Sequence, residues 1–232
     1  MRLRLATAIA TLLAVSAVRA ADMPLKAPPL PPPYNWTGFY AGIEGGGGWG
    51  SSHHATAGVP EFSGNFDVSG GLLGGTLGYN WQTGPAVLGV EGDASYGWLT
   101  GSTHGHGPAF CPPGPVGGTC TTKLRGLETL RVRLGYAWDR FMPYVTGGLA
   151  LGQIYGATDP GSANSGSTTR AGWTVGGGIE AAFAPHWTAK VEYLYADFGT
   201  ADGLFIRNPG AFPFNVSLKT NVVRVGVNYR FW

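Results

Sequence analysis

The sequence predicts an all-β fold: an eight-stranded antiparallel transmembrane up-and-down β-barrel. Three observations support this prediction. The 232 residues include 40 glycines and only 12% charged residues, which is unusual for a helix-rich soluble enzyme. Apolar side chains alternate with small or polar ones over about ten residues, in segment after segment. The connectors between these segments are alternately short and long, as in bacterial outer-membrane barrels with an even number of strands.

The composition excludes two other classes of protein. The 8 tryptophans, 10 tyrosines and 11 phenylalanines need a place to be buried, so an intrinsically disordered chain is excluded. Glycine and polar residues interrupt every apolar stretch beyond the N-terminus before the ~20 residues that a membrane helix needs. A helical membrane protein is therefore excluded as well.

The N-terminus has the features of a secretory signal peptide. An apolar run at residues 6–18 follows Arg2 and Arg4 and ends at Val18-Arg19-Ala20, so residues 1–20 are predicted to be removed. Removal takes three of the 15 basic residues and none of the 13 acidic ones, which leaves a formal charge of −1 and predicts no nucleic-acid partner. The proline-rich residues 21–35 predict an extended periplasmic lead-in, a spacer or alternatively a partner-binding motif, and residues 36–232 the barrel.

Eight strand segments are predicted from the alternation. They are residues 38–49, 68–81, 87–98, 123–138, 143–155, 170–183, 188–198 and 218–232. The short connectors are 82–86, 139–142 and 184–187, and the long ones are 50–67, 99–122, 156–169 and 199–217. This alternation predicts short periplasmic turns, long extracellular loops and both termini in the periplasm.

Each strand has one apolar face and one polar face. In the last segment, Val223, Val225 and Val227 share one face, and Arg224 and Asn228 lie on the other. In a membrane barrel such alternate residues face lipid and lumen. The apolar face is therefore predicted to contact lipid.

The charged strand residues are predicted to form a network in the lumen. Its five acids and five bases are Glu44, Glu91, Asp93, Glu180, Glu192, Arg131, Arg133, Lys190, Arg224 and Arg230. A base on the lipid face near mid-membrane costs about 2–4 kcal/mol, and the balance of signs predicts ion pairs. Glu128 breaks this segregation, which predicts a position above the apolar band or at a β-bulge. The pairing partners depend on strand register, which the sequence leaves open.

Aromatic residues at the strand ends distinguish a membrane barrel from a soluble lipocalin-like barrel, which charge alternation alone does not. Aromatic girdles are typical of the two membrane interfaces. One predicted belt, beside the short turns, consists of Tyr79, Trp81, Tyr136, Trp138, Phe183, Trp187, Tyr229 and Phe231. The other, beside the long loops, consists of Trp49, Trp98, Trp173, Tyr195 and Phe198.

Six motifs, in their order and spacing, resemble the small outer-membrane surface-antigen (porin-family) barrels of alpha-proteobacteria, within the OmpA-type eight-stranded superfamily. They are Trp36-Thr-Gly-Phe-Tyr-Ala-Gly, Gly78-Tyr-Asn-Trp-Gln, Leu130-Arg-Val-Arg-Leu-Gly-Tyr-Ala-Trp-Asp-Arg, Pro143-Tyr-Val-Thr-Gly-Gly-Leu-Ala, Lys190-Val-Glu-Tyr-Leu-Tyr-Ala-Asp and Val225-Gly-Val-Asn-Tyr-Arg-Phe. The resemblance covers residues 21–231. It supplies no catalytic residue.

The resemblance implies an outer-membrane location in a Gram-negative cell and assembly by the barrel-assembly machinery. That machinery would read the C-terminal aromatic Phe231, which is in phase with Tyr229, and Trp232 departs from the pattern by one added residue. The resemblance also implies a structural or surface-antigen role. Because an eight-stranded lumen is only wide enough for side chains, we expect at most narrow or gated passive diffusion. The alternatives are a true porin for small solutes and ligand or host-surface binding through the loops.

The predicted loops contain two further groups of candidate residues. Cys111 and Cys120 are the only cysteines, and past the inner membrane they are predicted to form a disulfide. His53, His54, His104 and His106 are weak candidates for binding haem or a divalent metal. Histidines on loops are more often solvated polar residues, so no metal or cofactor is predicted.

An enzymatic role is not predicted. His186 in a short turn, with Thr188 nearby, is the nearest approach to a base and a nucleophile, and the chain has no G-x-S-x-G motif. Its position beside Trp187 is better explained by the aromatic belt.

Overall fold

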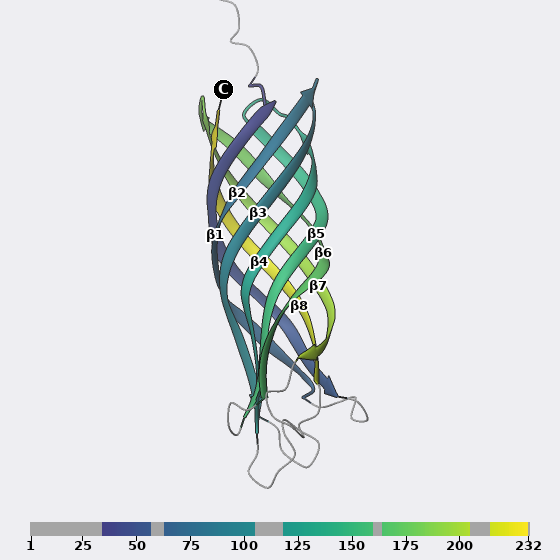
Figure 1. Cartoon of the computed structure of the whole chain (residues 1–232). Helices are drawn as coiled ribbons and strands as arrows, with labels where there is room; N and C mark the ends of the chain where they lie inside the picture. The colour runs from purple at the N-terminus through teal and green to yellow at the C-terminus, as the bar shows by residue number, and fades with distance from the viewer. Residues whose placement is uncertain (1–33, 57–62, 105–117, 160–163, 205–213, 232) are drawn as a thin grey trace, which may run out of the picture. The chain divides into compact units, whose positions relative to one another are not determined.

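The computed structural model describes residues 34–56, 63–104, 118–159, 164–204 and 214–231, and these residues form a closed β-barrel (Figure 1). Each strand pairs antiparallel with its neighbours in sequence, and the last pairs with the first. The predicted eight-stranded antiparallel barrel is therefore confirmed. The strands are β1 (Gly38–Thr56), β2 (Asn65–Thr83), β3 (Ala86–His104), β4 (Thr119–Tyr136), β5 (Phe141–Asp159), β6 (Asn164–Ala184), β7 (Trp187–Leu204) and β8 (Phe214–Arg230).

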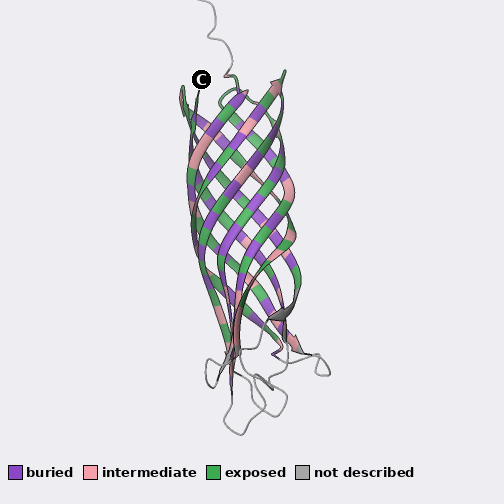
Figure 2. Ribbon diagram, in the orientation of Figure 1, coloured by how far each residue is buried: buried purple, intermediate pink, exposed green. Residues whose placement is uncertain are grey.

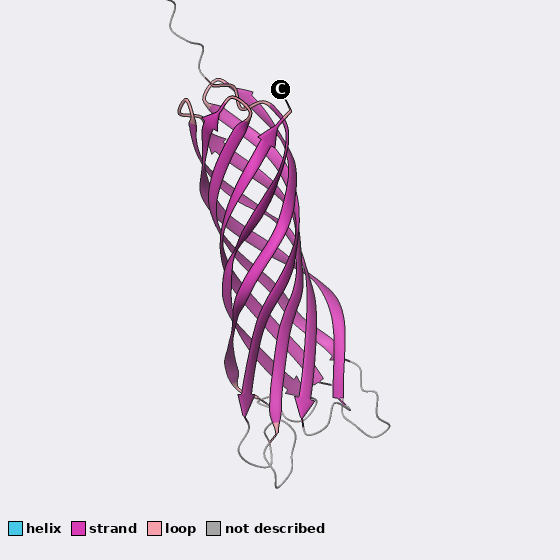
Figure 3. Cartoon of the chain, turned by 90° about the vertical axis from the view of Figure 1, so that its left-hand side faces the viewer, coloured by secondary structure: helices cyan, strands magenta, loops and turns pink. Residues whose placement is uncertain are grey.

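The two ends of the barrel differ in their connectors (Figure 3). We call the end with connectors 84–85, 137–140 and 185–186 the turn end, and the opposite end the loop end. The turn between β2 and β3 is two residues long, and Gly84 has the positive φ of 59° that such hairpin turns favour. No helix long and apolar enough to cross a membrane occurs among the described residues.

The strands extend further toward the loop end than the sequence predicts. β1 ends at Thr56 rather than residue 49, and β3 at His104 rather than residue 98. Much of the predicted loops 50–67, 99–122, 156–169 and 199–217 is therefore strand. Most outward residues of these extensions are polar, such as Ser51 on β1 and Thr100 and Ser102 on β3, so apolar alternation stops before the backbone ladder does. The ladder needs only backbone partners and continues without an apolar face.

Burial alternates along every strand, as the bands of Figure 2 show. On β8, Arg224 and Asn228 are buried inside the barrel, whereas Val223 and Val225 are exposed on the outside. The predicted phase is confirmed, because apolar residues such as Leu130, Val132 and Val225 are on the outside and the charges of the predicted network are inside. A soluble lipocalin-like barrel would have the reverse arrangement.

Aromatic side chains on the outside form two groups, one of them near the turn end. Near the turn end, Tyr79 packs against Trp81 with ring centroids 4.5 Å apart, and Trp187 packs against Tyr229 at 5.1 Å. The second group lies about midway along the strands, where Trp173 lies 5.3 Å from Tyr195. The assignment of Phe198 to this second belt was wrong. Its neighbour Asp197 faces outward, so alternation turns Phe198 into the interior, where it is buried.

A β-bulge interrupts the alternation on β4. The register with β5 shifts between Leu124 and Gly126, which leaves Arg125 as the extra residue. Leu124 and Leu127, three residues apart, are both buried in the interior as a result. Glu128 lies after this bulge, on the outward face, where it is exposed.

Adjacent strands approach closely at inward glycines. Gly148 on β5 pairs with Arg131 on β4, and a Cβ atom there would overlap the carbonyl oxygen of Leu130 and come within 2.8 Å of the Arg131 Cα. The neighbouring Gly147 faces outward, where the nearest atom to an added Cβ is 3.5 Å away.

We expect Gly148→Ala to lower the free energy of unfolding by about 1–3 kcal/mol, because the strands must separate to admit the methyl group. Gly147→Ala should leave it within about 0.5 kcal/mol. Urea unfolding of the refolded protein in lipid vesicles measures both. Equal stability of the two variants would contradict this account of the inward glycines.

Candidate functional site

The interior of the barrel is the candidate functional site, and a buried ion-pair network lies at its centre. Arg131 on β4 donates to Glu91 Oε1 at 2.6 Å, to Asp93 Oδ2 at 2.8 Å and, across the lumen, to Glu192 Oε1 at 2.8 Å. Its Nε donates to Thr129 Oγ1 at 2.8 Å. The guanidinium thus uses its fork of donors on three carboxylates from two strands.

Arg133 extends this network toward the turn end. It donates to Glu180 Oε2 at 2.6 Å, to Glu91 Oε2 at 3.2 Å and to the Tyr40 hydroxyl at 2.9 Å. Its guanidinium also lies 4.0 Å from the centre of the Tyr144 ring. The two tyrosines were not predicted as partners of the network, although both occupy inward positions of their strands.

Lys190 and Arg224 complete the network on the side of β7, β8 and β1. Lys190 Nζ lies 3.0 Å from Glu44 Oε2 and 3.2 Å from Glu91 Oε2. Arg224 binds Glu44, Asp93 at 3.0 Å and Glu192 at 2.6 Å. Nine of the ten residues predicted for the network are thus joined, and each is buried.

Arg230 has a different role from the one the sequence predicts. It is buried in the barrel, but its guanidinium donates to the backbone oxygens of Asn35 at 2.7 Å and Thr37 at 3.0 Å. It also lies over the rings of Tyr34 and Trp36. Because it occupies the last inward position of β8, its nearest acceptors belong to the segment before β1 rather than to the acids of the network.

An aromatic plug closes the turn end of the lumen. Trp36 is fully buried among Val87, Met142, Tyr144 and Ala182. Its backbone N–H donates to Gln82 at 2.6 Å and its indole N–H to the Asp139 oxygen at 3.0 Å. Residues 34–37 of the chain thus cover the inside of the barrel mouth, whereas residues 1–33, which include the predicted signal peptide and most of the lead-in, lie outside the described residues.

An apolar layer fills the lumen on the loop-end side of the charges. Its members are Phe66, Val68, Leu72, Leu99, Leu124, Leu127, Ala150, Ile154, Leu194, Ala196, Phe198, Val216, Leu218 and Val222. This layer was not predicted from the sequence, although its residues can be recognised by their inward phase. On β7, Leu194 follows Lys190 and Glu192 in the same inward phase, and on β8, Val222 is the inward residue next to Arg224.

A small polar cluster lies beyond the apolar layer at the loop end. His54 Nε2 bonds to Thr122 Oγ1 at 2.7 Å, and the Ser52 hydroxyl lies 2.8 Å from the same oxygen. All three residues are buried. Burial lowers the pKa of His54 to about 4, and the neighbouring His53 adds to the shift.

Three of the four candidate metal-binding histidines lie on strands rather than on loops. His53 and His54 belong to β1, and His104 ends β3, where its Nδ1 lies 3.0 Å from Thr119 Oγ1. His106 falls outside the described residues. Among those residues, no group of three or more His, Cys, Asp or Glu is arranged to hold a metal ion.

The remaining candidates are placed as follows. Cys120 is buried at the start of β4 and is disulfide-bonded, and its expected partner Cys111 lies outside the described residues. His186 Nδ1 lies 3.1 Å from the Arg230 oxygen, whereas the Thr188 hydroxyl is inside the barrel and donates to Glu180. These two residues therefore have separate partners.

Removing a single charge from the network should be costly. We expect Arg131→Met to lower the free energy of unfolding by about 3–5 kcal/mol, because Glu91, Asp93 and Glu192 would keep buried negative charge without their shared cation. As a control, Lys219→Met removes a cation that is largely exposed and 3.4 Å from Asp197, and should cost less than about 1 kcal/mol. Urea unfolding in vesicles compares them, and similar costs would contradict a stabilising network.

His54 should make the loop end sensitive to acid. It lies five residues beyond the belt residue Trp49 on β1. The unfolded chain binds a proton at an imidazole pKa of about 6.5, whereas native His54 does so only near pH 4. Stability from this residue is therefore full above pH 6.5 and falls by up to about 3 kcal/mol between pH 6.5 and 4. His54→Gln should remove this part of the pH dependence, and the exposed control His104→Gln should retain it in the same unfolding assay.

Comparisons with known proteins identify relatives of this chain. A model described as the outer membrane protein beta-barrel domain matches residues 7–231. The chain is 37% identical to the 31 kDa outer-membrane immunogenic protein of Brucella melitensis, over 96% of this chain and 97% of that protein. It is 31% identical to the 22 kDa outer membrane protein of Rhizobium leguminosarum, over 88% and 82%.

Among solved structures, the outer membrane protein OprG from Pseudomonas aeruginosa covers 85% of this chain and 98% of its own, with a TM-score of 0.51 and 13% identity, a likeness in fold. The resemblance stated from the motifs is confirmed by the family model and the curated relatives. The chain belongs to the outer-membrane β-barrel family that includes the Brucella outer-membrane immunogenic proteins.

Proposed function

We propose that this protein is a structural surface barrel of the outer membrane, with a surface-antigen role and without an open pore. The single observation that carries the proposal is the filled lumen. An aromatic plug, an ion-pair network and an apolar layer follow one another along the barrel. The names of the Brucella relatives, outer-membrane immunogenic proteins, support the surface-antigen part.

The three layers oppose permeation in different ways. The network holds its side chains by several short bonds each, so a passing ion would have to displace buried partners. An apolar constriction excludes ions by dewetting. Because the layers act in series, opening one of them leaves the others closed. Diffusion through this barrel is thus at most slow or gated.

The proposal includes an orientation and an assembly route. The turn end faces the periplasm with both termini, and the loop end faces the exterior, as is usual for outer-membrane barrels. Phe231, exposed and in phase with Tyr229, serves as the terminal aromatic that the barrel-assembly machinery reads. Trp232 lies outside the described residues.

Neither a metal-binding nor an enzymatic role is part of this proposal. His54 is turned inward to Thr122, and His104 is at the end of β3. His186 and Thr188 bind separate partners and form no nucleophile-base pair. Ligand binding through the long loops is an alternative to this proposal.

We expect the refolded protein to show no steady conductance steps in a planar bilayer. The Arg131→Ala, Arg133→Ala double variant should also be silent, because the apolar layer stays in series with the emptied network. Adding Leu99→Ala and Leu124→Ala, which thin that layer, together with Trp36→Ala, which opens the aromatic plug, should produce steps. Heat-modifiable mobility on gels checks that each variant is folded. Steps in the wild type would instead make the protein a porin.

A further inference from the structure

Two cations lie side by side on the outer face of the barrel near the loop end. On β4, Lys123 Nζ lies 5.9 Å and the Arg125 guanidinium 4.7 Å from the centre of the Tyr155 ring on β5. No ion pair involves either cation within the described part of the chain. On β8, by contrast, Lys219 has a carboxylate partner in Asp197, at 3.4 Å.

The β-bulge determines that these cations face outward. Counting back from the outward Leu130 by the strand period of two would place Lys123 and Arg125 in the interior. The extra residue at Arg125 reverses the phase, so that Leu124 joins the apolar layer and both cations are turned to the outside. The bulge therefore places two positive charges, without an ion-pair partner among the described residues, on the membrane-facing surface, about 7 Å apart along the strand.

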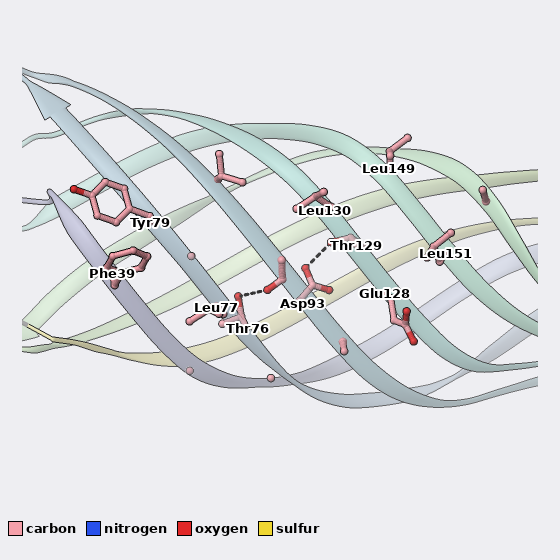
Figure 4. A pocket seen from close by; sticks show the side chains of 17 residues that line it. Phe39, Thr76, Leu77, Tyr79, Asp93, Glu128, Thr129, Leu130, Leu149 and Leu151 are labelled. Carbon is pink, nitrogen blue, oxygen red and sulfur yellow. Dashed lines mark hydrogen bonds between the residues drawn. The ribbon is translucent and has the colours of Figure 1, made fainter.

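An apolar groove lies on the same outer surface (Figure 4). It has a volume of about 910 Å³, with walls that include Leu77, Leu130 and Leu149 and a floor that includes Gly75 and Gly92. A Cβ atom would fit at either glycine, with the nearest atom 3.5 Å away at Gly75 and 3.8 Å at Gly92. Packing within the barrel thus does not require this hollow.

The groove and the cation pair are continuous along β4 and β5. Glu128, at the loop-end rim of the groove, is the next outward residue of β4 after Arg125. On β5, Gln153 separates the groove residue Leu151 from Tyr155 on the outward face. A molecule with an anionic head and an apolar chain would therefore reach both features within about 10–15 Å.

We propose that this surface binds a phosphate-bearing lipid of the outer leaflet. Its phosphate accepts hydrogen bonds from Arg125 and Lys123, and one acyl chain lies in the groove. The charges are complementary, and guanidinium geometry suits phosphate oxygens. The Glu128 carboxylate at the rim repels the phosphate and keeps it at the cation pair. The site rests on the proposed orientation, in which the loop end lies at the outer leaflet.

The test uses the refolded mature chain in detergent, titrated with bisphosphorylated lipid A and followed by native mass spectrometry. We expect the Lys123→Gln, Arg125→Gln double variant to bind about tenfold more weakly than the wild type, because it loses two charge-assisted contacts. Lys219→Gln, which removes one cation of an existing pair, should bind like the wild type. Glu128→Gln should bind equally or more tightly.

The groove is tested separately with Gly75→Leu, Gly92→Leu, which should weaken lipid A binding while the unfolding temperature stays unchanged. Absence of wild-type binding, or equal binding by the double cation variant, would overturn the proposal. Competition by millimolar inorganic phosphate with no effect of the groove variant would indicate a free-phosphate site instead. Conductance steps in the wild type would contradict the closed lumen and leave this result unaffected, so the two proposals fail independently.

Discussion

The closed backbone ladder is the constraint on which the rest of this structure depends. A bilayer offers no hydrogen-bond partners to the backbone, so every strand in it must pair on both sides. Here β8 pairs with β1 over Tyr40–Thr56, and no strand of the sheet is left with an open edge. Closure fixes a period of two on every strand, and this period divides the side chains between a lipid face and a lumen. The residues that fall on each face then determine whether that face is apolar or charged.

An eight-stranded lumen is only wide enough for side chains, so its buried polar groups bond mainly to one another. Charged groups removed from water require partners, and the arginines of the network meet this need by each binding more than one carboxylate, as Arg131 does with Glu91, Asp93 and Glu192. Nearer the loop end the same inward positions are apolar and need no such partners. The interior is therefore packed with charged side chains in one part and with apolar side chains in the next part along the barrel axis. A solute would meet obstacles of both kinds.

Departures from the period of two give this barrel features that a regular barrel lacks. The bulge at Arg125 lets β4 supply Leu124 to the interior and two cations to the outside, which regular alternation would forbid. Gly148 represents another local adjustment, in which a missing side chain allows β5 to approach β4 beside the network. Such adjustments shape both surfaces without altering the strand order.

The sequence by itself determined the fold, the two faces and nine members of the lumen network, because a period of two is local and is written in consecutive residues. The apolar pattern predicts Phe198 on the outside and predicts ends of β1 and β3 that come too early. It reflects the positions of apolar residues and not the backbone hydrogen bonds between strands. Only the tertiary structure decided which charges pair, that Trp36 and Arg230 close the turn end and that an apolar layer follows the charges. These features depend on register and on contacts across the lumen between residues as distant in sequence as Glu44 and Arg224, and no local pattern encodes them.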